Sequence, residues 1–121
     1  MSPLTTYRDL ESWQQAMDLA VLVLRAAPAL PPDERFGIGS QIRKAVVSIP
    51  SNIAEGYGRG SRLDYVRFLH IARGSLNEVT TLLLLIERQS YLPLDSLPPL
   101  FRTADRVGAL LHRLILSLEP K

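Results

Sequence analysis

The chain has 121 residues, of which 46% are hydrophobic and 21% are charged, and it contains no cysteine. Its length and apolar content fit one domain with a packed core over residues 1–121, so the composition excludes a largely disordered chain. The lack of cysteine excludes disulfides, thiolate metal sites and cysteine nucleophiles. The net charge is only +2, so the distribution of charges along the chain is more informative about binding partners than their sum.

The first predicted helix covers about residues 8–28. Apolar residues recur there at steps of three and four, which is typical of a helix with one face on a core. They are Leu10, Trp13, Met17, Ala20, Leu24 and Ala27. Pro28 is expected to end the helix, and Pro31-Pro32 to form the turn that follows, because proline lacks an amide donor and clashes with the preceding helical turn.

The second predicted helix covers about residues 38–58. Its apolar residues follow the same spacing: Ile38, Ile42, Ala45, Ile49, Ile53 and Gly56. Pro50 lies inside this pattern. Because the spacing continues beyond Pro50, we expect a kink at this position and not the end of the helix.

The third and fourth predicted helices cover about residues 62–90 and 96–118. Ser61 and Asp64 have the spacing of a capping box at the start of the third helix. Asp95-Ser96 followed by Pro98-Pro99 is typical of the cap and first turn of the fourth. The apolar positions are Tyr65, Leu69, Ala72, Leu76, Val79, Leu83 and Ile86, then Leu100, Ala104, Val107, Leu111, Leu114 and Leu118.

Four such helices with short connections predict an all-α fold, an antiparallel up-and-down four-helix bundle. Further apolar residues lie beside the four core-facing rows and suggest an interface between copies of the chain. They are Val21, Leu22, Val46, Phe68, Ile71, Leu82, Leu85, Leu110 and Ile115. The alternative is a single broad core face that buries them within one chain.

No apolar stretch is long enough to cross a bilayer, and the first residues lack the pattern of a signal peptide. Leu19–Leu24 and Leu82–Ile86 are the longest candidates. The chain is therefore expected to be soluble and cytoplasmic, with no membrane partner.

Positive charge is concentrated between Arg35 and Arg73, where seven basic residues stand against two acidic ones. Such a cluster can follow a nucleic-acid backbone, with Tyr57 nearby for base stacking. The alternative is a solvated face with local salt bridges. The candidate nucleic-acid contacts are Arg43, Lys44, Arg59, Arg62 and Arg67.

The stretch Gly56-Tyr57-Gly58-Arg59-Gly60-Ser61 resembles a nucleotide-binding loop only superficially, because no strand precedes it and no Lys-Ser or Lys-Thr pair ends it. We interpret it as a tight turn between helices that uses glycine for unusual backbone angles. A second possibility is a phosphate site built from Arg59, Arg62 and the first amides of the third helix.

Polar residues lie beside the core-facing row of the second helix and on one face of the third, where they can form a hydrogen-bonded network between the two helices. The members of this expected network are Gln41, Ser48, Asn52, Glu55, Arg73 and Glu78. Its alternative reading is a ligand pocket or an active site with Asn52, Glu55 and Glu78. No nucleophile–base pair supports an enzyme, so no catalytic residue and no cofactor are expected.

A metal site is not expected either. Di-metal sites in helical bundles use paired Glu-x-x-His elements, whereas Gly58 and Thr81 stand three residues after Glu55 and Glu78. His70 and His112 have no matching carboxylates.

Three stretches carry a family resemblance: LESWQQAM over 10–17, GIGSQIRKAVVSIPSNIAEGYGRG over 37–60 and FLHIARGSLNE over 68–78. Over about residues 8–118 the chain resembles the bacterial four-helix bundle family named after proteins encoded in intervening sequences of the large-subunit ribosomal RNA gene. The most specific part is Ser48–Gly56, supported by Ile71–Leu76. Lys44 and Val46 stand where the family more often has arginine and alanine.

The resemblance implies an antiparallel bundle that assembles into a ring, commonly a pentamer. A related branch comprises accessory proteins of diversity-generating retroelements, in which the basic bundle is thought to engage reverse transcriptase and nucleic acid. We therefore expect a non-enzymatic homo-oligomer, a pentameric ring, that contacts RNA or DNA through the second and third helices. The alternatives are a scaffold for a protein partner with no nucleic-acid role and, less favoured, an enzyme with a polar pocket between these helices.

Overall fold

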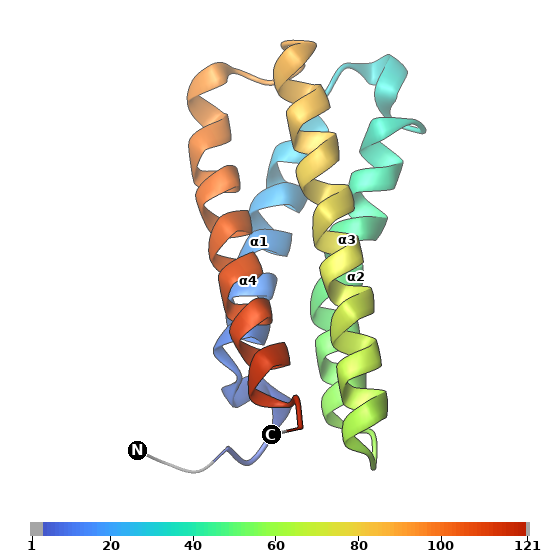
Figure 1. Ribbon diagram of the computed structural model, residues 1–121. Helices are drawn as coiled ribbons and strands as arrows, with labels where there is room; N and C mark the ends of the chain where they lie inside the picture. Colours follow the sequence, from blue (N-terminus) through green and yellow to red (C-terminus); the bar gives the residue numbers. More distant parts are fainter. Residues whose placement is uncertain (1–3, 121) are drawn as a thin grey trace.

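The computed structural model describes residues 4–120 and consists of four long helices joined by short connections (Figure 1). Successive helices run in opposite directions, so the all-α four-helix bundle is confirmed, and residues 4–120 contain no strand. Each helix has two neighbours: α1 packs against α2 and α4, and α3 packs against α2 and α4. The helices are α1 (Glu11–Ala26), α2 (Ile38–Tyr57), α3 (Arg62–Arg88) and α4 (Leu97–Ser117).

Helix α1 is shorter than the predicted 8–28, because a 3₁₀ turn occupies each end of that stretch. At the N-terminal end, Thr6 and Asp9 form a capping box around Tyr7–Asp9, and Leu10 then adopts an extended conformation before the α-helix begins. At the other end, Pro28 lies within the second 3₁₀ turn, Ala27–Ala29. The α-helix therefore ends just before Pro28, as the proline predicts.

Helix α2 continues through Pro50, which is buried inside it. The helix tolerates the missing amide donor because the flanking residues Ile49 and Ile53 are fully buried, which holds both halves against the core. The helix thus does not break at this proline, as its apolar spacing indicated.

The starts of α3 and α4 differ in how they are capped. Ser61 Oγ accepts a hydrogen bond from Asp64 N at 3.1 Å, which satisfies one of the free amides of α3. Asp64 directs its carboxylate to Arg67, so the structure shows one half of the expected capping box. Ser96 is the N-cap of α4, but its hydroxyl donates to the Pro93 carbonyl at 2.6 Å and makes no cap bond.

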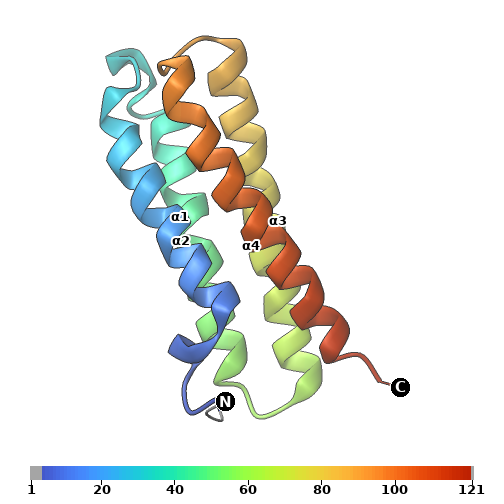
Figure 2. The same cartoon turned by 90° about the vertical axis from the view of Figure 1, so that its left-hand side faces the viewer.

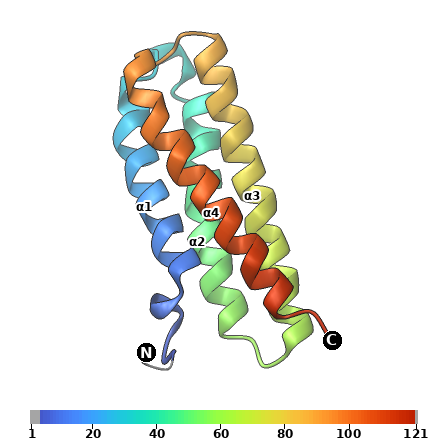
Figure 3. The same cartoon turned by 60° about the vertical axis from the view of Figure 1, so that its left-hand side comes forward.

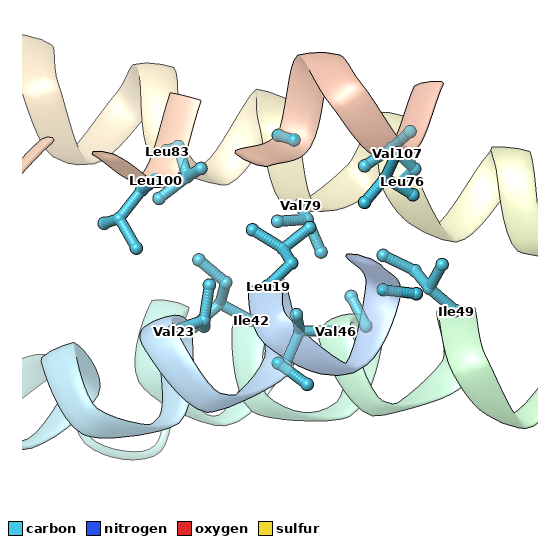
Figure 4. Packing of buried hydrophobic residues seen from close by; sticks show 14 of the residues in the cluster. Leu19, Val23, Ile42, Val46, Ile49, Leu76, Val79, Leu83, Leu100 and Val107 are labelled. Atoms are coloured by element: carbon cyan, nitrogen blue, oxygen red, sulfur yellow. The ribbon is translucent and has the colours of Figure 1, made fainter. Parts of the chain in front are cut away.

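The core fills the space between all four helices along the length of the bundle (Figure 4). Aliphatic side chains from each helix point into it, and Leu19, Ile49 and Val79 are completely buried. The layers are built almost entirely from leucine, isoleucine, valine and alanine, which bring no polar side-chain group into the core. Within residues 4–120, Ser12 is the one buried polar residue, and its hydroxyl has no hydrogen-bond partner. The labelled core residues are Leu19, Val23, Ile42, Val46, Ile49, Leu76, Val79, Leu83, Leu100 and Val107.

The additional apolar residues divide into two groups. Val46, Leu82, Leu110 and Ile115 are buried, so for them the broad core face is correct. Val21, Ile71 and Leu85 remain 41%, 42% and 44% exposed, and Leu22 and Phe68 are half-buried. For the exposed group the broad core face does not hold.

The glycines near the α2–α3 turn do not have the unusual backbone angles we expected, and that prediction is wrong: no described glycine has a positive φ. Gly56 is required for packing instead. A Cβ at this position would lie 2.8 Å from the Phe68 Cβ and 3.2 Å from the Tyr65 carbonyl oxygen. The absence of a side chain therefore lets the end of α2 approach the start of α3.

No helix within residues 4–120 is long and apolar enough to cross a membrane. Within the same residues, His, Asp and Glu side chains do not gather in a group of three or more that could hold a metal ion.

Candidate functional site

Two arginines converge on one aromatic ring where α2 ends and α3 begins. The guanidinium carbon of Arg59 lies 4.9 Å from the centre of the Phe68 ring, and that of Arg67 lies 4.6 Å from it. Both arginines also have a carboxylate neighbour, since Arg59 Nη1 is 3.8 Å from Glu55 Oε1 and Arg67 Nε is 3.6 Å from Asp64 Oδ1. These ion pairs are long and solvent-exposed, so they are weak. We call these residues the Phe68 arginine cluster.

Arg62 lies at the same end of the bundle but has a different partner. Its Nη1 donates to the carbonyl oxygen of Leu118 at 3.0 Å. Leu118 is the C-cap of α4, so this bond satisfies a carbonyl that the helix itself leaves free. Arg62 thus connects the start of α3 to the end of α4.

Tyr57 packs against the base of this cluster. Its ring meets Tyr65 edge to face, with 6.0 Å between the ring centres. Burial, with a smaller contribution from Tyr57, raises the pKa of Tyr65 to about 12. Tyr57 is therefore partly engaged in packing and presents only part of its ring for stacking on another molecule.

Arg43 and Lys44 lie far from these residues. Arg59 follows the end of α2 at Tyr57, and the stretch of helix from Arg43 to Tyr57 is about 21 Å long. Arg43 is half-buried at the opposite end of the bundle, where its Nη2 donates to the Arg35 carbonyl oxygen at 3.1 Å. Lys44 is exposed beside it. The five basic residues predicted to form one surface therefore fall into two groups at the two ends of α2.

The polar side chains at the middle of the α2–α3 contact form a short hydrogen-bonded chain. The hydroxyls of Ser48 and Ser75 are 2.8 Å apart, and Asn52 Nδ2 donates to the Ser48 carbonyl at 2.8 Å and to its hydroxyl at 2.9 Å. Ser75 was not among the predicted members of the network. Its signal in the sequence was its place one position before the core residue Leu76, on the side of α3 that faces Ser48.

The other predicted members of the network lie outside this chain of hydrogen bonds. Glu55 pairs with Arg59, and Arg73 Nη2 lies 2.8 Å from the His70 ring nitrogen Nδ1. Gln41 and Glu78 are exposed. Asn52, Glu55 and Glu78 line none of four hollows on the described surface.

An apolar groove runs along the contact between α1 and α2, the two helices on the left of Figure 2. It has a volume of about 370 Å³. At one end Trp13 stacks edge to face on Tyr7, with 5.3 Å between the ring centres. Its exposed lining residues are Met17, Val21, Leu24 and Val47, at 39%, 41%, 40% and 46% exposure. We call this feature the α1–α2 groove.

Comparison with known proteins covers nearly the same residues as the bundle. A family model described as 23S rRNA-intervening sequence protein matches residues 8–113. A crystal structure of a protein with unknown function from the S23 ribosomal protein family of Bacteroides thetaiotaomicron shares 25% sequence identity, with a TM-score of 0.80, over 86% of this chain and 97% of that chain. No curated protein matches this chain. The family match and the structural likeness agree on one helical architecture.

Proposed function

The chain belongs to the 23S rRNA-intervening sequence protein family, and on that premise we propose that it is a non-enzymatic, self-associating module that binds RNA or DNA electrostatically. The binding surface is the Phe68 arginine cluster. The protein acts by holding other macromolecules and performs no chemistry of its own.

The observation that carries this proposal is the pair of guanidinium groups on the Phe68 ring. Arginine stacked on an aromatic ring keeps its planar donors in a fixed orientation, which suits contacts with phosphate oxygens. The side chains of Arg59 and Arg67 remain 44% and 57% exposed, so their donors are accessible. Phosphate groups can replace the weak ion pairs with Glu55 and Asp64, because exposed pairs contribute little stability.

Self-association supports the same proposal by multiplying the cluster. One subunit presents few positive charges, whereas several copies around a ring present a continuous surface, and binding that neutralises more phosphates is tighter. The α1–α2 groove is one candidate face for the contact between copies. The other is the outer side of α3, where Ile71 is exposed and Gly74 faces open space.

The borders of these two faces offer one pair of opposite charges, since Lys44 lies one turn before Val47 in α2 and Glu78 lies one turn after Gly74 in α3. Because the faces differ, their contact is head-to-tail, and repeated contacts of this kind close into a ring when the rotation between neighbouring copies divides a full turn evenly. This geometry is the one that a pentamer requires, although it is compatible with other ring sizes.

The test is the affinity of the protein for a short 5′-hydroxyl oligonucleotide, measured by fluorescence anisotropy across a salt series. R59Q/R67Q is expected to weaken binding at least about tenfold at low salt and to lower the dependence on salt concentration. R102Q/R113Q is the matched control, since it removes the same charge from exposed positions of α4.

Equal binding by wild type and R59Q/R67Q would contradict the nucleic-acid proposal. If the wild-type protein binds neither RNA nor DNA at low salt, the protein-scaffold alternative replaces it. That alternative depends on the α1–α2 groove and is independent of the arginines.

A further inference from the structure

The α1–α2 connection, at the opposite end of the bundle from the Phe68 arginine cluster, encloses a hollow of about 400 Å³. This volume lies in the range of ~300–1,000 Å³ typical of small-ligand pockets. The α1–α2 connection forms a largely apolar wall. The side chains of two arginines also line the hollow. The lining residues are Ala27, Leu30, three prolines (Pro28, Pro31 and Pro32), Arg35 and Arg43. We call it the Arg35–Arg43 pocket.

The two arginines in this pocket have no carboxylate partner within residues 4–120. Arg43 uses one guanidinium nitrogen to donate to the Arg35 carbonyl, which orients the group and leaves its other donors free. Arg35 lies over the Phe36 ring at 5.3 Å. Arg35 and Arg43 therefore differ from Arg59, Arg67 and Arg106, each of which faces a carboxylate.

Neither acid of the connection forms an ion pair with Arg35 or Arg43 within residues 4–120. Glu34 Oε1 accepts a hydrogen bond from Ile38 N at 3.4 Å, and Oε2 accepts one from the Tyr91 hydroxyl at 3.0 Å. The hydrogen bond from the Tyr91 hydroxyl to Glu34 is the main reason that the pKa of Tyr91 is raised. Asp33 is exposed, and neither acid lines the pocket.

The pocket is also held in shape before any ligand enters. The three prolines have fixed φ angles and lose little conformational freedom on binding. Glu34 ties the connection to α2 and to the loop before α4, and a Cβ at Gly39 would lie 2.9 Å from the Glu34 carbonyl oxygen. The turn that carries Arg35 is therefore tightly packed against the start of α2.

Phe36 follows Arg35 in the chain and adds a second binding element beside that arginine. Its side chain is 86% exposed, which is the highest exposure among the large apolar side chains of residues 4–120. A free aromatic face beside two arginines is the combination that stacks a nucleic-acid base while cations hold the adjoining phosphate.

We propose that the Arg35–Arg43 pocket binds the terminal phosphate of a 5′-nucleotide, with the attached base stacked on Phe36. A terminal phosphate carries roughly two negative charges near neutral pH and three acceptor oxygens, which matches two arginines better than the single charge of an internal phosphodiester. The ligand is either a free mononucleotide or the 5′-phosphorylated end of a single strand, because both present the same chemistry. In its choice of ligand this inference rests on the proposed function, but it assigns a separate site.

The test compares two ten-nucleotide single strands that differ only in a 5′-phosphate or a 5′-hydroxyl group. The wild-type protein is expected to bind the 5′-phosphorylated strand about tenfold more tightly. R35Q/R43Q is expected to reduce this preference to about twofold or less, while R25Q/R88Q, which removes the same charge at the same end of the bundle, keeps it. F36A is expected to weaken both the strand and the mononucleotide without altering the fold, because Phe36 packs on little else.

Direct titration with adenosine 5′-monophosphate separates the two sources. Binding that R35Q/R43Q abolishes identifies a nucleotide site, and a preference seen only with the strand identifies a strand end; both support the pocket. Equal affinity for the two strands with no binding of the mononucleotide overturns it, as does loss of the preference in R25Q/R88Q. Since the 5′-hydroxyl strand alone tests R59Q/R67Q, either site can fail while the other stands.

Discussion

At the scale of single residues, Gly56 determines how closely α2 and α3 pack. Its neighbours are Phe68 and Tyr65, and the phenylalanine is the ring on which Arg59 and Arg67 stack. The position of this glycine thus affects both the fold and the candidate binding surface.

We predict that Gly56→Ala lowers the free energy of unfolding by about 1–3 kcal/mol, because the new methyl group has no room and the helices must move apart. Gly74→Ala is the matched control. Gly74 also lies inside a helix but faces open space, so alanine there is expected to stabilise a single bundle by about 0.5–1 kcal/mol. Urea unfolding of both variants measures the difference, and equal effects would show that Gly56 is not under steric constraint.

The roles of Arg62 and Arg43 could not be predicted from the sequence, because each depends on a backbone group outside its own helix. Arg62 donates to a carbonyl oxygen 56 residues away, and Arg43 donates to the carbonyl oxygen of Arg35, in the connection before α2. Helical periodicity indicates the side of a helix on which a residue lies. It does not indicate which backbone group a long, flexible side chain will reach.

The helices themselves were predicted well because their signals are local. Proline, serine caps and regular apolar spacing determine where an isolated helix can begin and end. The exceptions also have local causes: the 3₁₀ turn at Tyr7–Asp9 shortens α1, and Pro28 lies within a second such turn at Ala27–Ala29. Close packing at Gly56 was missed because a glycine near a turn is usually explained by its backbone angles.

At the scale of the elements, a strained residue follows the C-terminal end of α3, directly after the C-cap Gln89. Ser90 has a φ of 55°, the only positive φ of a non-glycine residue within residues 4–120. The Tyr91 amide donates to the Ile86 carbonyl at 3.0 Å, as in the motif that ends helices with a left-handed residue. Serine pays a steric penalty in this conformation that glycine does not.

Ser90→Gly is therefore expected to raise the unfolding free energy by about 0.5–1 kcal/mol, after allowance for the greater freedom of glycine in the unfolded chain. Ser90→Val should destabilise, since a branched side chain is worse in this region. Thermal unfolding followed by circular dichroism gives both values. A loss of stability in Ser90→Gly would mean that the left-handed conformation is not the source of strain.

The unequal distribution of exposed apolar surface matters at the scale of the whole molecule. The α1–α2 groove and the outer side of α3 lie on different faces of the bundle, and the core between them is already filled. The sequence indicated excess apolar surface, but only the folded chain distinguishes buried Val46 from exposed Val47, its neighbour in α2.

We predict that V21E/V47E dissociates the oligomer, because two carboxylates in an apolar contact have no partners. Light scattering should give a mass that is a multiple of 13.5 kDa for the wild type and one close to the monomer for the variant. L94E/L116E is the control: both leucines are more exposed than Val21 and Val47 and lie outside the groove and outside α3. A monomeric wild type, or an unchanged mass for V21E/V47E, would exclude the groove as the interface.

The bond between Arg62 and Leu118 has a practical consequence for joining this chain to another. The start of α1, the end of α4 and the α2–α3 turn all lie at one end of the bundle (Figure 3). A fluorescent label or a fused domain joined before α1 or after α4 is therefore expected to be held at the end of the bundle that carries the Phe68 arginine cluster. The α1–α2 connection stays open under the same fusion, so tethering at the termini would silence one anion site and leave the other to report alone.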